Sequence, residues 1–239
     1  MKTLLRLFFR LLYHEFAITY DLVAATVSFD RWKDWVMSVL PFIQGKRILE
    51  IGHGPGHLQQ ALLSQGMVAV GIDASPQMGH LAQRNLRKRA SSAAPNGSSH
   101  SPVSPSAYTQ INLTRGLAQH LPFPNETFNT VVATFPAEYI FDPTTLIEAR
   151  RVLVQDGRFV ILPGATITGR SGIDRLLAWI FQVTGETPPN LSEILHERSK
   201  EPFAKAGFQV EVHEVTIRSS LVFIMLATKI QIKENLQYA

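Results

Sequence analysis

The sequence predicts an α/β protein whose core is a doubly wound, mostly parallel seven-stranded sheet, with helices before the first strand and an antiparallel hairpin of strands at the end. Two observations predict this class. Between residues 46 and 164, short aliphatic and β-branched runs alternate with segments of helical periodicity, and such alternation is typical of parallel βαβ units. The last two apolar runs, 208–217 and 220–230, are separated by a short connection, so they should pair antiparallel.

The individual elements follow from apolar runs, caps and turn residues. The expected strands are short runs rich in aliphatic and β-branched residues: 46–51, 68–73, 108–113, 127–135, a fifth strand that follows a tight turn within 155–164, 208–217 and 220–230. The expected helices carry apolar residues at helical spacing: 56–66, 75–89, 142–153, 171–185 and 190–207. Ser75 and Asp142 are expected N-caps, each followed by a proline at the first helical position.

Two segments lie outside this alternation. Residues 90–107 are rich in Ser, Pro, Ala and Gly and have few large apolar groups, which predicts a flexible surface insertion. Residues 1–42 precede the first strand and are expected to form a helical cap. Two short helices fit residues 19–40, the second with Trp32 and Trp35 on one face.

The N-terminal stretch, residues 1–16, sets basic side chains at helical spacing within an apolar run. Arg6, Arg10 and His14 recur every fourth residue and would share one helical face. Arg6 and Arg10 interrupt the apolar run and no convincing small-residue cleavage site follows, which argues against a signal peptide. Three interpretations stay open: a helix packed on its own domain, a lid over a site, or an anchor on a membrane surface.

Composition excludes several kinds of function. The chain has no cysteine, which excludes disulfides, thiolate metal sites and cysteine nucleophiles and gives no support to an oxidising compartment. We find no credible cluster of metal ligands and expect no metal site. No apolar run is long enough to span a bilayer, so we expect a cytoplasmic protein. The net charge of +4 permits an anionic partner without requiring one.

A glycine-rich loop, GHGPG, follows the first expected strand and opens the first helix. Ligands of doubly wound sheets bind at the carboxyl ends of the strands, so this loop lies where a ligand is expected. Gly52, Gly54 and Gly56 can adopt positive φ and let a ligand approach the backbone closely. A dinucleotide fingerprint would have its third glycine at position 57, which is His57, and no Gly-Lys-Ser/Thr follows as in a Walker loop. The loop and the helix N-terminus suit a pyrophosphate or a single carboxylate.

Asp73 ends the second expected strand, about 20 residues after the first glycine of the loop. This is the spacing of an acid that binds ribose, and its carboxylate can accept hydrogen bonds from both ribose hydroxyls. The loop and Asp73 together therefore predict a nucleoside ligand.

Three motifs now stand in order along the chain: ILEIGHGPG at 48–56, VGIDAS at 70–75 and LPFPNETFNTVV at 121–132. They resemble the motifs of the class I S-adenosylmethionine-dependent methyltransferases, and most closely those of the type 11 group, which includes quinone-biosynthesis methyltransferases. The resemblance spans roughly residues 14–165. It implies a Rossmann-like fold, a methyltransferase enzyme and S-adenosyl-L-methionine as the cofactor.

The resemblance also implies roles for individual residues. Glu50 and the loop backbone would hold the methionine end of the cofactor, and Asp73 would bind the ribose. The residues implied in cofactor binding are Tyr20, Glu50, Gly52, His53, Gly54, Pro55, Gly56, Asp73, Ala74, Met78, Leu117, Ala118, Thr134 and Phe135. Two positions depart from the family pattern. Leu117 replaces a frequent acid, so any contact with the adenine amino group there must come from the backbone. Asn129 replaces the usual Asp, at a site that we expect to be structural.

Methyl transfer from a sulfonium mainly requires the acceptor to be aligned, and orientation can supply up to about 10 kcal/mol. A general base is needed only where the acceptor keeps a proton at neutral pH. His53, Glu138 and Tyr139 are the candidate catalytic residues, from the glycine loop and from the loop after the fourth strand. Each also has a structural interpretation, as a loop side chain, a solvated acid and a packing residue, respectively.

We expect a single domain over residues 1–239 and a small, apolar or aromatic acceptor that is quinone-like, phenolic or lipid-like. Its pocket would lie between the cap, the loop after the fourth strand and a helical region at 166–206, where Trp179, Ile180 and Phe181 suggest an apolar cavity. A lipid or quinone acceptor would also explain a basic N-terminal helix in peripheral contact with the inner face of the membrane.

Two alternatives stay open. The acceptor could be RNA, which the basic run RNLRKR at 84–89 motivates, or the protein could bind the cofactor without turnover. The chain has no Asn/Asp-Pro-Pro-Tyr after the fourth strand, which argues against methylation of exocyclic amines in DNA. Nucleic acid is therefore the less favoured acceptor.

Overall fold

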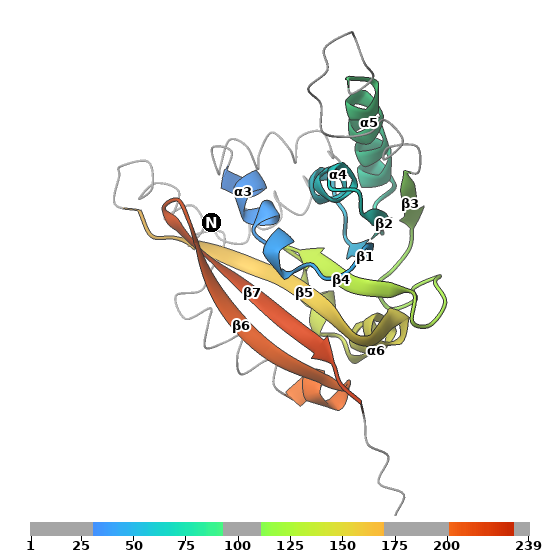
Figure 1. The fold of residues 1–239 in the computed structure, drawn as a ribbon, viewed down its shortest axis with the longest axis vertical. Helices are drawn as coiled ribbons and strands as arrows, with labels where there is room; N and C mark the ends of the chain where they lie inside the picture. Colours follow the sequence, from blue (N-terminus) through green and yellow to red (C-terminus); the bar gives the residue numbers. More distant parts are fainter. Residues whose placement is uncertain (1–30, 93–110, 170–200, 232–239) are drawn as a thin grey trace, which may run out of the picture.

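The computed structural model describes residues 31–92, 111–169 and 201–231, and these residues build one seven-stranded sheet (Figure 1). Its strands lie in the order β3-β2-β1-β4-β5-β7-β6. The strands are β1 (Arg47–Ile51), β2 (Val68–Asp73), β3 (Asn112–Arg115), β4 (Phe128–Thr134), β5 (Leu153–Ile167), β6 (Phe208–Ile217) and β7 (Ser220–Lys229). The first five pair in parallel, and β7 pairs antiparallel with both β5 and β6. The predicted fold class is confirmed.

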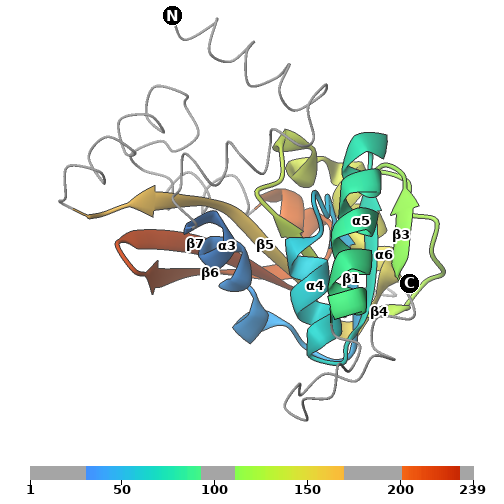
Figure 2. The same ribbon diagram turned by 90° about the horizontal axis from the view of Figure 1, so that it is seen from above.

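Helices cover both faces of this sheet. The described helices are α3 (Arg31–Met37), α4 (His57–Ser64), α5 (Pro76–Ser92) and α6 (Pro143–Val152), with short 3-10 turns η1 (Leu40–Phe42) and η3 (Glu138–Phe141). Figures 1 and 2 show α3, α4 and α5 on one face and α6 on the other. The expected caps form: Asp142 Oδ1 accepts from the backbone N–H of Thr144 at 2.8 Å, and Ser75 Oγ from that of Met78 at 3.3 Å.

Neighbouring residues of the central strands pack into two different cores, because side chains alternate across a strand. Ile48 and Val132 pack with the apolar cluster under α3 and α4, whereas Leu49 and Val131 pack with the cluster under α6. All four side chains are fully buried. A parallel sheet covered on both faces requires such continuous aliphatic runs.

Several expected boundaries differ from the observed ones, and three of these differences have a clear physical reason. The third strand was expected at 108–113 but β3 runs to Arg115, because Thr114 and Arg115 continue the ladder beside Ile72 and Asp73. α5 extends to Ser92, so the start of the expected insertion is helical; Ala and Ser tolerate a helix, and composition alone did not mark its end. β5 continues to Ile167 because its last residues pair with β7, so the expected helical region at 166–206 begins in a strand. Residues 201–205 are helical.

Several expected features lie outside the described residues. These are the N-terminal segment with Arg6, Arg10, His14 and Tyr20, the insertion from residue 93 to 107, and the apolar group Trp179, Ile180 and Phe181. Within the three described ranges, no helix is both long and apolar enough to cross a bilayer.

Candidate active site

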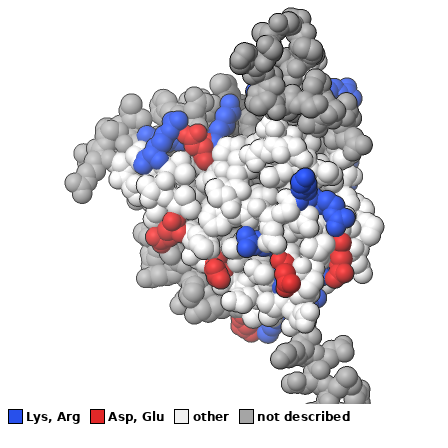
Figure 3. All heavy atoms as spheres, viewed as in Figure 1, with Lys and Arg blue, Asp and Glu red and all other residues white. Residues whose placement is uncertain are grey.

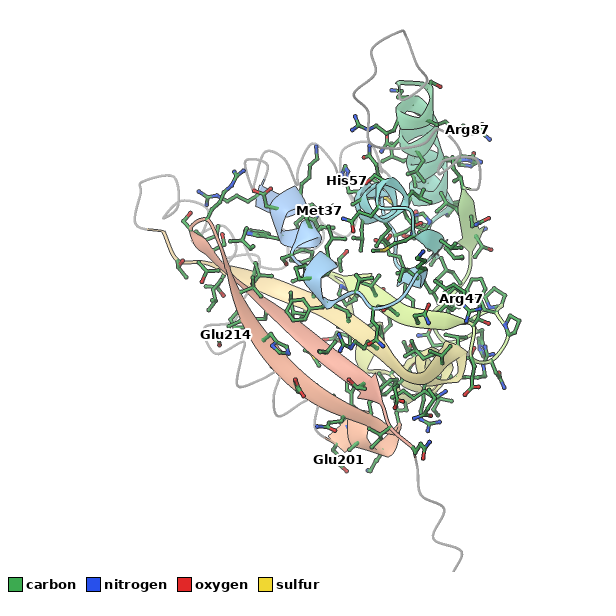
Figure 4. All side chains as sticks on the ribbon, in the orientation of Figure 1. Met37, Arg47, His57, Arg87, Glu201 and Glu214 are labelled. Atoms are coloured by element: carbon green, nitrogen blue, oxygen red, sulfur yellow. The ribbon has the colours of Figure 1, made fainter. Side chains whose placement is uncertain are left out.

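The glycine loop lies between the end of β1 and the start of α4, at the carboxyl edge of the sheet. Figure 4 labels Arg47, where β1 begins, and His57, where α4 begins. Gly52, Gly54 and Gly56 have φ values of +71°, +51° and +85°, all in the left-handed region that glycine adopts freely. A β-carbon built on Gly54 would meet no heavy atom within 4 Å. The loop therefore leaves open space over its backbone, where a ligand can approach.

The Asp73 carboxylate fixes the backbone at Gly54. The Gly54 N–H donates to Asp73 Oδ2 at 2.9 Å, while the other oxygen, Oδ1, accepts from the N–H of Ser75 at 2.8 Å. Asp73 thus ties the glycine loop to the turn after β2. Each carboxylate oxygen can accept a second hydrogen bond, so Asp73 can still receive hydroxyl groups of a ligand.

His53 lies under the loop and against β2. Its Nδ1 is 2.8 Å from the carbonyl oxygen of Gly54, and because a carbonyl can only accept, Nδ1 must carry the hydrogen. A β-carbon added to Gly71 would lie 2.9 Å from Cδ2 of the imidazole, so the ring packs directly on that glycine. Burial lowers the pKa of His53, although the charge of Asp73 opposes the shift. This placement favours the structural interpretation of His53 over that of a general base.

Glu50 ends β1 with a side chain that is 1% exposed. Its Oε2 accepts a hydrogen bond from Nε2 of Gln59 on α4 at 2.8 Å. Burial raises the pKa of Glu50 to about 8; the hydrogen bond from Gln59 lowers it and the charge of Asp73 raises it further. The carboxyl is therefore largely protonated at neutral pH until a cation comes close.

A cleft opens over the loop between α3, β1 and β4. Its lining combines backbone and polar groups with aromatic and aliphatic side chains. The lining residues are Trp32, Val36, Glu50, Gly52, His53, Gly54, Pro55, His57, Leu58, Met78, Thr134 and Phe135. Eight of them belong to the set that the family resemblance implied in cofactor binding.

An aromatic pair forms the wall of the cleft away from the glycines. The rings of Trp32 and Phe135 stack with centroids 3.9 Å apart at an interplanar angle of 25°. Phe135 has φ +49°, an unusual value for a residue with a side chain, which costs on the order of 1–3 kcal/mol. Its N–H donates to the carbonyl of Leu162 on β5 at 2.7 Å, which helps to hold this conformation at the end of β4.

The remaining predicted residues surround this cleft. The Tyr139 hydroxyl oxygen would lie 2.9 Å from a β-carbon built on Gly52, so η3 reaches back over the glycine loop. Glu138, the other candidate on η3, is exposed and contacts no polar partner within the described residues. The other predicted cofactor residues are those expected near the adenine. Met78 and Ala118 are buried, whereas Ala74 and Leu117 are exposed, and Leu117 is 54% exposed. These positions can receive a flat ring against an apolar surface.

Asn129 has the structural role that was expected of it. Its Oδ1 accepts from the backbone N–H groups of Lys46 at 3.2 Å and Arg47 at 3.1 Å. A β-carbon on Gly45 would collide with the Asn129 side chain. Asn129 therefore joins the start of β1 to β4, at the edge of the sheet opposite the glycine loop.

Sequence reasoning missed one aromatic and one polar residue of the site. Trp32 was placed on an apolar helix face, but only the fold brings it onto Phe135. Gln59 was not singled out, although a polar residue between the buried Leu58 and Leu62 on one helix is a recognisable signal.

Residues 49–161 match the protein family described as a methyltransferase domain, type 11. The uncharacterized methyltransferase YcgJ of Bacillus subtilis (strain 168) is 29% identical over 48% of this chain and 40% of its own length. The ubiquinone/menaquinone biosynthesis C-methyltransferase UbiE of Geotalea uraniireducens (strain Rf4) is 25% identical over 65% of this chain and 62% of its own. The ubiquinone biosynthesis O-methyltransferase of Cereibacter sphaeroides is 26% identical over 70% and 65%, respectively. The chain thus spans less than two thirds of each relative.

Solved structures share the fold. A SAM-dependent methyltransferase of Thermotoga maritima superposes with a TM-score of 0.57 at 18% identity, covering 91% of this chain and 97% of that one. Residues 49–161 thus match a methyltransferase domain, and the chain has the fold of S-adenosylmethionine-dependent methyltransferases; this domain and this fold imply S-adenosyl-L-methionine as the cofactor.

Proposed function

We propose that the protein transfers a methyl group from S-adenosyl-L-methionine to a small apolar or aromatic acceptor of quinone-like, phenolic or lipid-like chemistry. The observation that carries this proposal is the composition of the cleft. One side presents open loop backbone and the Glu50 carboxyl, and the other presents the stacked rings of Trp32 and Phe135. The polar side suits the charged amino-acid end of the cofactor, and the aromatic side suits an apolar acceptor in contact with the cofactor.

The polar side has the donors and acceptors that the cofactor requires. When bound, S-adenosyl-L-methionine supplies a methyl group on a positively charged sulfur. Glu50 would receive the ammonium group of its methionine end, and the open backbone at Gly54 would receive the carboxylate. Asp73 would accept from the ribose hydroxyls with the lone pairs that Gly54 and Ser75 leave free. The apolar surface of Met78 would pack against the adenine.

The aromatic side supports the choice of acceptor class. Flat rings pack well against an offset aromatic face, and such contacts contribute about 0.5–1.5 kcal/mol beyond burial. Two of the relatives are named for quinone biosynthesis, one as a C-methyltransferase and the other as an O-methyltransferase. A phenolic or quinone ring held against Trp32 would be fixed in orientation, which is the main catalytic requirement of this reaction.

Proton removal from the acceptor would fall to η3 rather than to the glycine loop. The Tyr139 hydroxyl stands over Gly52, whereas the imidazole of His53 is buried beneath the loop with Nδ1 committed to Gly54. Glu138 is exposed on the same turn and can relay a proton to water. We therefore favour Tyr139 and Glu138 over His53 as groups that contact the acceptor.

The decisive experiment is a transfer assay with labelled S-adenosyl-L-methionine against phenols, quinone precursors, amines and lipids. We expect label in an aromatic or lipid-like product with the wild-type protein and none with Asp73→Ala. Glu214→Ala is the matched control, because Glu214 is an exposed acid on β6, far from the cleft (Figure 4). Cofactor binding without a labelled product from any acceptor would instead identify a binding module.

RNA is a second candidate acceptor, favoured by one feature of α5. This helix carries Arg84, Arg87, Lys88 and Arg89 and no acidic residue, and three of these basic residues line a surface groove. On the face shown in Figure 3, by contrast, basic and acidic side chains are interspersed. Binding to RNA should weaken steeply with salt if this groove is used. Salt-independent affinity for RNA would exclude it.

Contact with a membrane is a further part of the proposal and rests on the basic amphipathic pattern of residues 1–16. A quinone or lipid acceptor dissolved in a cytoplasmic membrane face would be reached most easily by a protein held there. Deletion of residues 1–12 should reduce sedimentation with anionic vesicles. Unchanged vesicle binding and unchanged turnover of a membrane-dissolved acceptor would contradict this part.

A further inference from the structure

Gln59 places an amide in a helix face that is otherwise aliphatic. Leu58, Leu62 and Leu63 are buried around it on α4, and Gln59 itself is 1% exposed. A buried amide without partners is costly, so its hydrogen bonds carry information about its role. Nε2 donates to Glu50 Oε2 at 2.8 Å and to the carbonyl of Val70 on β2 at 3.3 Å. The amide thus joins the end of β1 to β2 directly beneath the glycine loop.

Gln59 holds the Glu50 carboxyl from one side. Its Nε2 donates to Oε2, and its backbone N–H also interacts with the carboxyl, whereas no other side chain of the described residues donates to Glu50. Glu50 lines the cleft together with Gly52 and Thr134. The amide therefore restricts the rotation of the carboxyl, which can still face a ligand from the cleft.

We propose that Gln59 is a positioning residue for cofactor binding: it holds Oε2 of Glu50 so that the carboxyl stays available to the ammonium group of S-adenosyl-L-methionine. This inference rests on the proposed function, since it concerns the same cofactor and the same cleft. It assigns a role to a side chain that contacts neither acceptor nor cofactor itself.

The surroundings of Glu50 determine how such a role can be measured. Asp73 contributes a negative charge from β2, and His53 and His57 are the titratable groups that share the cleft lining from the loop and α4. The lining residues from α3 and β4 are uncharged. Because burial holds the pKa of Glu50 at about 8, the carboxyl must lose a proton when the cation binds. Affinity should therefore rise with pH, by up to about tenfold per unit, below pH 8.

Removal of the Gln59 side chain should shift the rise of affinity to higher pH. The hydrogen bond from Gln59 lowers the pKa of Glu50, so its loss raises that pKa further and makes deprotonation harder. The useful range is pH 5.5 to 7.5, because an α-amino group loses its own proton near pH 7.7–8.0. Across that range the Gln59→Leu variant should bind S-adenosyl-L-methionine more weakly than wild type, by about tenfold for each unit by which the pKa of Glu50 rises.

The experiment is calorimetric titration with two probes, S-adenosyl-L-methionine and 5′-methylthioadenosine, which lacks the amino-acid end. The proteins are wild type, Gln59→Leu, Glu50→Gln and the control Gln60→Leu, whose side chain is the next along α4 and has no polar partner among the described residues. We expect Gln59→Leu to weaken only the first probe, Glu50→Gln to remove the rise of affinity with pH, and Gln60→Leu to match wild type.

Four results would overturn the inference. If Gln59→Leu and wild type have the same pH profile for S-adenosyl-L-methionine, the amide does not position Glu50. If Gln59→Leu loses both probes equally, or fails to fold, its role is structural. A rise with pH that persists in Glu50→Gln would assign the proton to another group. If wild type binds 5′-methylthioadenosine but not S-adenosyl-L-methionine, or binds neither, the proposed function fails together with this inference.

Discussion

The two walls of the cleft are built by different physical means. The glycine-loop wall is held by hydrogen bonds from side chains to backbone, with Asp73 bonded to Gly54 and Ser75 at 2.9 and 2.8 Å. The opposite wall contains the packed rings of Trp32 and Phe135, whose centroids lie 3.9 Å apart. A hydrogen-bonded frame tolerates little change and suits an invariant cofactor. A packed aromatic wall can change shape with modest cost and suits the apolar acceptor that we propose.

The largest effect is expected from Asp73, because it serves both the loop and the ligand. Asp73→Ala removes the acceptor for two backbone N–H groups and for the ribose. Since each hydrogen bond to a charged group contributes about 1.5–3 kcal/mol, affinity for S-adenosyl-L-methionine should fall by a factor on the order of 100 or more. Calorimetry measures this, with Glu214→Ala as the control. A loss below fivefold would mean that the hydrogen-bonded wall is not the cofactor wall.

The next effect tests how tightly the hydrogen-bonded wall is packed. In Gly71→Ala the new methyl group would lie 2.7 Å from Cδ2 of Leu113 and 2.9 Å from Cδ2 of His53. Such overpacking typically costs about 1–3 kcal/mol of unfolding free energy. Urea unfolding should show this loss for Gly71→Ala, and part of it should be recovered in the double variant with His53→Ala. Independent, additive effects of the two changes would show that the imidazole does not rest on Gly71.

The contrast between the walls also explains what could be predicted from the sequence. Gly52, Gly54 and Gly56 were expected to have positive φ, and Asp73 to stand by the loop, because both requirements are local to one βαβ unit. All three φ values are positive and Asp73 bonds to Gly54. The end of β2 at Asp73 was also as expected, and β4 ends at Thr134, one residue before its expected end.

Features that depend on tertiary contacts were not predictable in the same way. Trp32 belongs to the helix before β1, and nothing in its own segment says that it meets Phe135. The end of β3 at Arg115 is set by its pairing with Asp73 rather than by propensity. The partly buried Asn129 shows the opposite case: a departure from the family pattern correctly indicated a structural residue, because an amide oxygen accepts from Lys46 and Arg47 as a carboxylate would.

A smaller effect should separate the two walls functionally. Trp32→Ala removes one member of the stacked pair, and aromatic pairs contribute about 0.5–1.5 kcal/mol beyond burial. We expect KM for the acceptor to rise by up to about tenfold, with affinity for S-adenosyl-L-methionine within twofold of wild type. Trp32→Phe should recover most of the loss. An equal loss for cofactor and acceptor would mean that the aromatic wall also carries the cofactor.

The smallest effect concerns the proton on His53 and tests whether the loop wall depends on a neutral imidazole. Burial lowers the pKa of His53 below its ordinary value of 6.5. Between the folded pKa and 6.5 the unfolded chain therefore binds more protons than the folded one, so stability falls as pH falls through this window. The change in the urea midpoint from pH 7.5 to pH 5.5 should be less favourable to the folded protein in wild type than in His53→Ala, whatever the absolute cost of that substitution. The two proteins are compared by the change of their stability with pH, because Glu50 acts with the opposite sign in both: its raised pKa makes stability fall as pH rises toward 8.

An equal change of stability with pH in wild type and His53→Ala would contradict this prediction. It would show that the imidazole takes up its proton as easily in the folded protein as in the unfolded chain, and the hydrogen bond from Nδ1 to Gly54 would then persist in acid.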